Sequence, residues 1–218
     1  MDIIWHGHSC FTLKGKNATV VTDPYKDVGL KLPELTADIV TVSHGHEDHN
    51  NVEAVNGDVK VIDWPGEYER KNVSVLGLEA FHYSKSEGKD AEKRGKNIIY
   101  VIEIDDVKVC HLGDLGHKLT SELTEAIGDV DVLLVPVGGK FTIDYKKAVE
   151  VIEQIEPRVV IPMHYKTDGN TVDIDTNERF LKEVGVTDVK EESKFEIKSV
   201  SELPDDRMEF TVLKPITG

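Results

Sequence analysis

Short apolar runs in this chain repeatedly stop at a histidine or an aspartate, and the densest case follows Ile39–Val42. There the sequence reads His44-Gly45-His46-Glu47-Asp48-His49. Where a strand runs into a loop, residues two apart lie on one side, so His44 and His46 are expected to share an ion. Asp48 and His49, where the chain turns toward a helix, are expected to face a second ion. Imidazole and carboxylate groups suit zinc and other divalent transition metals, so this segment predicts a metal site.

One loop does not close two coordination spheres, so the remaining ligands are expected at other strand ends. Three such ends carry a suitable side chain: His82 after Val73–Phe81, Asp114 after Val107–Leu112, and His164 after Val159–Met163. Each of them, taken singly, is typical of an ordinary polar residue. Their recurrence beside the histidine-rich segment indicates one shared site.

The order of the predicted elements favours an α/β fold with packed sheets and outer helices. Strands are expected first, at Ile3–Trp5, Cys10–Leu13, Ala18–Thr22, Ile39–Val42, Val59–Ile62, Val73–Phe81, Ile98–Ile104 and Val107–Leu112. Strands at Val132–Val137, Val159–Met163 and Met208–Leu213 then alternate with helices at Leu119–Ile127, Tyr145–Ile155 and Thr176–Val184. Asp144 is expected to cap the second of these helices, and Gly185 to end the third.

The composition is that of a globular chain. Its 218 residues, 39% hydrophobic and 31% charged, predict a single domain over residues 1–218 with a buried core. No apolar run approaches the roughly 18 residues of a spanning helix, and the N-terminus does not resemble a signal peptide. We therefore expect a cytoplasmic protein whose Cys10 and Cys110 are buried thiols. The sequence leaves open whether the protein forms a homo-oligomer.

The formal net charge of −15 bears on the partners. Nucleic-acid backbones are bound mainly by neutralising phosphates with lysine and arginine, so a nucleic-acid substrate is disfavoured. Anionic membranes are disfavoured for the same electrostatic reason. Bound divalent cations would offset part of the negative charge, and a small molecule is the expected substrate.

Several phrases of the sequence resemble the metallo-β-lactamase fold superfamily, over nearly the whole chain. The narrower match is to the metal-dependent hydrolase branch that includes ascorbate-6-phosphate lactonase. It is carried by His6-Gly7-His8-Ser9-Cys10, Thr22-Asp23-Pro24, Ala80-Phe81-His82, His111-Leu112-Gly113-Asp114 and Pro162-Met163-His164-Tyr165. The resemblance implies a four-layer αββα sandwich with the site at one edge of the sheets.

The resemblance also implies how the ligands divide between two metals. His44, His46 and His82 would hold one ion; Asp48, His49 and His164 would hold the other; Asp114 would bridge them. Zinc is the first choice, and manganese, iron and nickel use the same donor types. In one departure from many relatives, Leu115 replaces a threonine after the bridging aspartate and is followed by Gly116-His117.

Two ions sharing a carboxylate can hold a water and lower its pKa toward neutrality, which makes a hydroxide nucleophile. The expected activity is hydrolysis of an ester, lactone, amide or phosphoester bond of a small molecule, with Asp114 and Asp48 as catalytic carboxylates. The alternative is a metal-dependent nuclease or phosphodiesterase, although no long basic arm is visible. A di-iron oxygen- or nitric-oxide-reducing protein is ranked lower because that branch usually has glutamate at His46 and a fused flavin domain. A non-catalytic metal-binding protein is a fourth reading.

Other residues have supporting roles that the sequence leaves open. Asp23 is expected to accept a hydrogen bond from a ligand histidine. Of His6 and His8, which share a face if extended, His8 is assigned to the pocket as a catalytic residue. The Tyr165 hydroxyl either stabilises an oxyanion or belongs to a packed aromatic. His111 is expected to pack beneath the site. The glycine turn before Lys140 either contacts substrate or is a plain turn, and the charged segment Ser84–Lys96 is either a surface loop or a flap.

Overall fold

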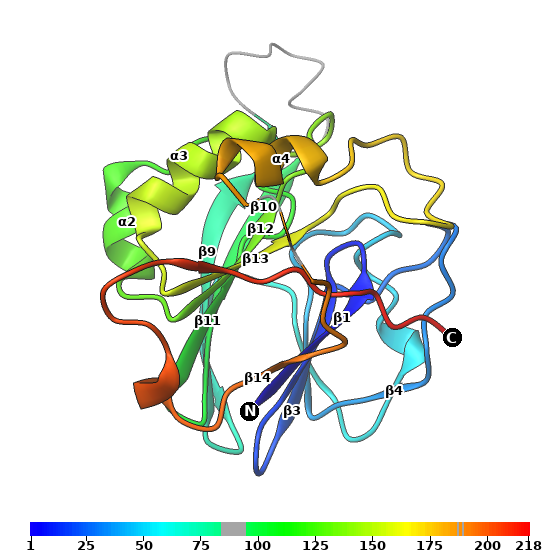
Figure 1. Cartoon of the computed structure of the whole chain (residues 1–218). Helices are drawn as coiled ribbons and strands as arrows, with labels where there is room; N and C mark the ends of the chain where they lie inside the picture. Colours follow the sequence, from blue (N-terminus) through cyan, green and yellow to red (C-terminus); the bar gives the residue numbers. More distant parts are fainter. Residues whose placement is uncertain (84–94, 187, 189) are drawn as a thin grey trace.

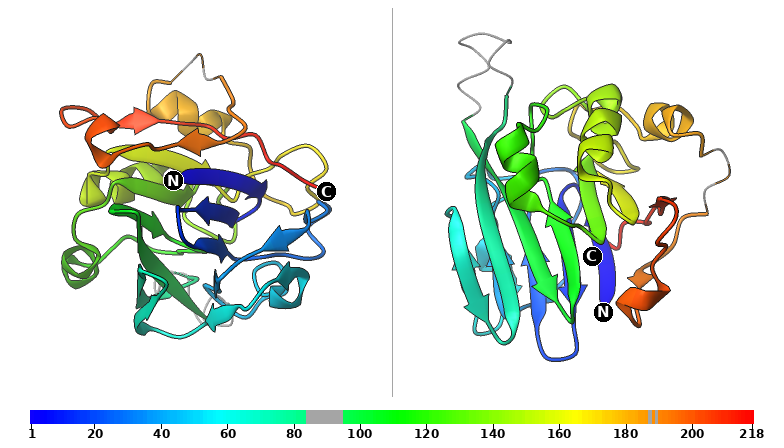
Figure 2. Two further views of the ribbon diagram at one scale, coloured as in Figure 1. Left: turned by 90° about the horizontal axis from the view of Figure 1, so that it is seen from below. Right: turned by 90° about the vertical axis from the view of Figure 1, so that its left-hand side faces the viewer.

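Two β-sheets lie face to face in the computed structural model, which describes residues 1–83, 95–186, 188 and 190–218 (Figures 1 and 2). The first sheet has six strands in the order β14-β1-β2-β3-β5-β7. Its members are β14 (Phe195–Glu196), β1 (Asp2–Gly7), β2 (Cys10–Lys14), β3 (Thr19–Thr22), β5 (Ile39–Thr41) and β7 (Lys60–Ile62). A small sheet pairs β4 (Leu35–Thr36) with β6 (Val55–Asn56).

The second sheet has seven strands in the order β15-β13-β12-β11-β10-β9-β8. They are β15 (Glu209–Phe210), β13 (Val159–Met163), β12 (Val132–Pro136), β11 (Val107–His111), β10 (Lys96–Ile104), β9 (Val73–Phe81) and β8 (Gly66–Arg70). The strands β11, β12, β13 and β15 are parallel, and β8, β9 and β10 form an antiparallel meander that joins them.

Alternating side chains of the six-stranded sheet enter two different cores. Val20 and Ile39 belong to the large core between the sheets, whereas their neighbours Val21 and Val40 belong to a smaller core on the outer face. Successive residues of a strand point to opposite faces, so a sheet with apolar residues at both positions must be covered on both sides. The smaller core is completed by the segment from Tyr25 to Leu35.

The helices α2 (Ser121–Ile127), α3 (Tyr145–Ile155) and α4 (Glu178–Glu183) lie on the outer side of the seven-stranded sheet (Figure 1). The Thr120 side chain accepts from the Leu123 amide at the start of α2, and Asp144 caps α3 as predicted. On the other side, the described residues provide loops, the β4–β6 pair and the 3-10 turn Val52–Ala54. The predicted α/β fold of the metallo-β-lactamase type is confirmed, with these loops as its fourth layer.

Strand direction brings the predicted metal ligands to one edge. Since β10 is antiparallel to both β9 and β11, these two strands run the same way, as do β12 and β13. Their carboxyl ends therefore meet at one edge of the sheet, as ligand-bearing loops do in other parallel sheets. In the facing sheet, β5 ends immediately before the histidine-rich segment.

Element prediction succeeded where the apolar pattern was strong. The predicted ranges Val73–Phe81, Tyr145–Ile155 and Val159–Met163 match the structure. The edge strand Gly66–Arg70 was missed because its sequence, GEYER, is mostly charged and none of it is fully buried. The last strand is Glu209–Phe210, shorter than the predicted Met208–Leu213.

Two further predictions meet the limits of the described chain. The segment Ser84–Lys96, predicted to be a surface loop or a flap, lies outside the described residues, apart from Gly95 and Lys96. Among the residues that the structure describes, no helix combines the length and apolar character needed to cross a bilayer.

Candidate metal centre

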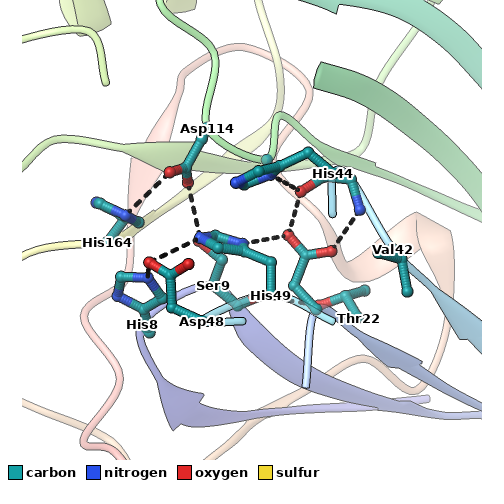
Figure 3. A network of polar contacts seen from close by, with 12 residues as sticks. His8, Ser9, Thr22, Val42, His44, Asp48, His49, Asp114 and His164 are labelled. Atoms are coloured by element: carbon teal, nitrogen blue, oxygen red, sulfur yellow. Dashed lines mark hydrogen bonds and ion pairs between the residues drawn. The ribbon is translucent and has the colours of Figure 1, made fainter. Parts of the chain in front are cut away.

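All of the predicted ligands gather at the common strand edge (Figure 3 shows most of them). They are His44, His46, Asp48, His49, His82, Asp114 and His164. His44, His46 and His82 form one group whose ligand atoms lie within 4.8 Å of one another. This is the set that the resemblance implied for the first ion.

The second half of the centre contains one histidine more than the implied ligand set. His44, Asp48 and His49 form one group with ligand atoms within 4.8 Å, and His8, His49 and His164 form another. The His8 ring lies 4.1 Å from that of His164 between centroids, and its Nε2 lies 3.2 Å from Asp48 Oδ2. The structure therefore places His8 inside the centre, beside Asp48.

Asp114 lies between the two groups. One of its carboxylate oxygens, Oδ1, is 3.3 Å from His49 Nε2. The other, Oδ2, is 3.1 Å from His82 Nε2 and 3.3 Å from His164 Nε2. A carboxylate in contact with histidines from both groups has the position expected of a bridging ligand.

Asp23 and Ser43 support the two histidines on the six-stranded sheet. Asp23 Oδ2 accepts from His49 Nδ1 at 2.8 Å and from Ser43 Oγ at 2.5 Å, and its Oδ1 accepts from the Ser43 amide at 2.7 Å. Since the single Ser43 hydroxyl hydrogen goes to Asp23, the His44 Nδ1 at 3.0 Å must donate to Ser43 Oγ. Both rings then direct Nε2 toward the centre, and it is the Nε2 without a proton that binds a metal.

The electrostatics of the metal-free chain suit a bound cation. Burial, helped by His49, holds the pKa of His44 well below its ordinary value. Burial also favours neutral His49, but Asp114 and Asp23 outweigh it and raise the pKa of His49 well above the usual range. Burial alone would raise the pKa of Asp114, yet His164 and His49 hold it well below its ordinary value. The ionised carboxylates thus hold a proton on His49 that a metal can replace.

Several buried polar atoms of the centre have no hydrogen-bond partner within the described chain. They are His44 Nε2, His49 Nε2, His82 Nδ1 and Nε2, Asp114 Oδ1, His8 Nδ1 and His164 Nδ1. Leaving such groups unsatisfied costs about 1–3 kcal/mol each, so a cluster of them calls for an explanation. Nitrogen and carboxylate atoms converging on one point fit a divalent metal, which would satisfy several of them at once.

A cavity of about 430 Å³ opens over the centre. Its wall consists of His46, Asp48, His82, Asp114, Phe141, His164 and Val172. Such a volume is in the range of roughly 300–1,000 Å³ typical of small-molecule sites. Five of the predicted ligands thus line a pocket with room for a small molecule.

Three residues of the centre have left-handed backbone conformations that cost free energy. They are His8 (φ 51°), Asp23 (φ 38°) and His164 (φ 51°). Non-glycine residues adopt this region rarely, and it persists where the surrounding structure enforces it. The His164 amide donates to the His8 carbonyl at 3.0 Å, which ties two of these residues together across the sheets.

The comparisons with known proteins agree with this geometry. A sequence profile of the beta-lactamase superfamily domain matches residues 2–164. A solved structure from Thermotoga maritima, assigned to the Zn-dependent hydrolases of the metallo-β-lactamase superfamily, is 40% identical and has a TM-score of 0.77. The match covers 97% of this chain and 98% of that one. This chain belongs to the metallo-β-lactamase superfamily.

Other relatives of this metallo-β-lactamase superfamily member carry the predicted class of activity in their names. A UPF0173 metal-dependent hydrolase of Thermoplasma volcanium is 33% identical, and the match covers 77% of this chain and 84% of that protein. A metallo hydrolase from Ignicoccus hospitalis is 22% identical, covers 90% of this chain and 99% of its own, and has a TM-score of 0.62, which shows the shared fold. The predicted class, a metal-dependent hydrolase, is confirmed; the narrower link to ascorbate-6-phosphate lactonase stays a prediction.

The residues after Asp114, where the sequence departs from many relatives, pack in the core and hold the loop that carries Asp114. Leu115 is fully buried in the core between the sheets. His117 Nε2 accepts from the Phe81 amide at 3.1 Å, and the Gly116 amide donates to the Phe81 carbonyl. The loop that carries Asp114 is thereby joined to the strand end that carries His82.

Sequence reasoning missed Asn97. Its fully buried side chain accepts from the Asp114 amide and donates to the Leu112 carbonyl, both at 2.9 Å. Next to it, the Ile98 amide donates to the Ser43 carbonyl at 2.8 Å. An asparagine near a strand start carries no visible signal, because its partners lie on a loop far along the chain.

Two candidates from the sequence make contacts with residues other than the predicted ligands. Tyr165 packs on Trp5 with ring centroids 4.9 Å apart and lines a separate cavity that includes Asn177, so the structure does not bring its hydroxyl to the metal ligands. The catalytic role of Tyr165 stays a prediction, without support from these contacts. Lys140 forms an ion pair with Asp173 at 2.5 Å.

The other two histidines, His6 and His111, are buried and form hydrogen bonds. His6 Nε2 is 2.8 Å from Thr12 Oγ1, and His6 Nδ1 is 3.1 Å from the Ile216 carbonyl. His111 Nε2 lies 2.9 Å from the Ser9 carbonyl, beneath the site as expected. Of the pair at residues 6 and 8, only His8 reaches the centre, because the chain bends at Gly7 and residue 8 takes a positive φ.

Proposed function

We propose that this protein hydrolyses an ester, lactone, amide or phosphoester bond of a small molecule at a site that holds two divalent cations, zinc first among them. The observation that carries the proposal is the position of Asp114 between two groups of histidines. His44, His46 and His82 would hold one cation; Asp48, His49 and His164 would hold the other. When bound, such ions supply charge stabilisation and lower the pKa of water toward neutrality.

The residues of the chain have separate tasks in this proposal. Asp114, kept ionised by the surrounding histidines, accepts a hydrogen bond from the attacking water and orients it toward the substrate. Its low pKa suits orientation better than storage of a proton. Asp23 and Ser43 fix the tautomers of His49 and His44, so that both rings face inward.

His8 and Asp48 form the remaining polar pair. Burial, reinforced by His164, lowers the pKa of His8 to about 3, so the ring is neutral near pH 7. A neutral ring whose Nε2 donates to Asp48 keeps that carboxylate turned toward His49. We therefore assign His8 to the positioning of Asp48.

Metal analysis of the purified protein, followed by an activity screen, tests the proposal. We expect about two ions per chain. A screen of esters, lactones and phosphodiesters with zinc, manganese, iron and nickel should then find hydrolysis that Asp114→Asn abolishes. Zero metal after gentle purification, with folding indifferent to chelators, would sink the proposal. Activity on RNA alone would favour the nuclease instead.

A further inference from the structure

Two large apolar side chains that remain exposed line cavities at the metal centre. Three are exposed among the described residues: Trp64 (68%), Phe141 (42%) and Ile216 (41%). Phe141 lines the cavity over the metal ligands, and Trp64 lines a second cavity beside it. Exposed aromatic rings that converge on a polar site are more typical of ligand recognition than of random surface composition.

The second cavity has a volume of about 430 Å³ and shares a wall with the first. Its lining is Ser43, His44, Gly45, His46, Asp63, Trp64, Pro65, Glu79, Gly95, Lys96, Asn97 and Ile98. His46 belongs to both cavities, so a molecule lying over that ligand reaches both. The Gly45 Cβ position has no heavy atom within 4 Å, so the space beside this residue of the second cavity is open.

Trp64 is held by its backbone while its ring remains uncovered. The Tyr68 hydroxyl donates to the Trp64 carbonyl at 3.0 Å. At the end of β7, the Tyr100 hydroxyl donates to the Ile62 carbonyl at 2.8 Å. The backbone that carries the ring is therefore in place before a ligand binds, and only the side-chain rotamer of Trp64 has to be ordered on binding.

The charges around Trp64 select against an anion. Asp63 and Glu79 contribute carboxylates to the lining. Among the described residues of that lining, the one lysine or arginine is Lys96, which is ion-paired with Glu79 at 2.5 Å. Trp64, Pro65 and Ile98 offer apolar surface instead, so a flat uncharged group fits this cavity better than a phosphate or carboxylate.

We propose that the Trp64 cavity is a substrate subsite that receives an uncharged aromatic substituent while the scissile bond lies over the metal ligands. The description of this cavity as a substrate subsite rests on the proposed hydrolase function. Binding of an aromatic group in the cavity does not require a metal. It predicts that the substrate is a neutral aromatic ester, lactone or amide. Trp64 acts as a specificity-determining residue.

Fluorescence titration of the full-length protein tests the subsite. The chain has two tryptophans, and Trp5 is fully buried, so Trp64 dominates any signal from an added ligand. Three neutral or charged amides serve as probes: N-benzylacetamide, N-propylacetamide, and N-benzylacetamide with a carboxylate on the ring. We expect the benzyl probe to bind roughly tenfold more tightly than either of the others, as aromatic stacking with apolar burial allows.

The variants Trp64→Ala and Ile216→Ala give the matched comparison. Both remove an exposed apolar side chain, but only Trp64 lines the cavity. Binding measured by calorimetry should lose its preference for the benzyl probe in Trp64→Ala and keep it in Ile216→Ala. Equal affinity of the three probes for the natural protein, or an unchanged preference in Trp64→Ala, would overturn the subsite. Absence of metal or hydrolysis, by contrast, would count against the proposed function alone, since these probes bind without either.

Discussion

The two sides of the metal centre are held in place by different means. On the six-stranded sheet, His44 and His49 rest on a network of side-chain hydrogen bonds that ends at Asp23. On the seven-stranded sheet, His82 Nδ1 and His164 Nδ1 have no such partner in the part of the chain described. Figure 3 shows the first arrangement, with Asp114 above it.

Backbone hydrogen bonds take over on the second side. The His82 amide donates to the Gly95 carbonyl at 3.2 Å, and the His164 amide donates to the His8 carbonyl at 3.0 Å. Asp114 is held through its own amide by Asn97. The first side thus fixes the tautomers of the His44 and His49 rings, whereas the second side fixes only the backbone of its ligands. We infer that the first side is organised before metal binds and that the second completes its arrangement around the ion.

Removing Asp23 should have the largest effect, because it withdraws support from both rings of the first side. Asp23→Asn should weaken metal binding by roughly 10–100-fold, as loss of a carboxylate behind a ligand histidine does. Competition with a chromophoric chelator measures this. Asp58→Asn removes a carboxylate that is 95% exposed, and it should leave the affinity unchanged. An Asp23 variant with the natural affinity would contradict the comparison.

Asn97 tests the second side, where a backbone contact holds the ligand. Asn97→Ala leaves the Asp114 amide and the Leu112 carbonyl without partners, which should cost about 1–3 kcal/mol of folding stability. Metal affinity should fall by less than about tenfold, since no ligand ring loses its tautomer. Urea unfolding of metal-free protein gives the first value, with the exposed Asn17→Ala as control. A larger loss of affinity than in Asp23→Asn would reverse the order proposed for the two sides.

The effect on metal binding should be smallest for His8, which contacts both sides without supporting a ring, and its variant is expected to change mainly the pH dependence of stability. Its pKa is about 3 in the folded chain against 6.5 when unfolded, so the unfolded state binds one more proton between these values. Stability of the metal-free protein should therefore fall as pH decreases from 6 to 4, by about 1.4 kcal/mol per pH unit for this group. His8→Gln should reduce that slope by one proton. Unfolding curves at several pH values measure it, and an unchanged slope would show that His8 is not buried as a neutral ring.

The sequence by itself determined which residues meet at the metal centre. Strong apolar runs such as Val73–Phe81 and Val159–Met163 form strands because their side chains are stable only when buried. The histidine that follows each of these strands marks the edge of the sheet. The pattern did not find Gly66–Arg70, whose pairing comes from its neighbour β9 rather than from its own residues. An apolar pattern predicts an element only when the element is stabilised by burial of its own side chains.

Tertiary structure alone decided how those residues are supported and which of their neighbours take part. Asp23, Ser43 and Asn97 act through partners on other strands, and Tyr165 turns to Trp5 although it follows a ligand directly. His8 enters the centre because a left-handed turn ends the period-two alternation on which its assignment was based. Hydrogen bonds between distant segments depend on distances of a few tenths of an ångström, and only the packing of the two sheets sets those distances.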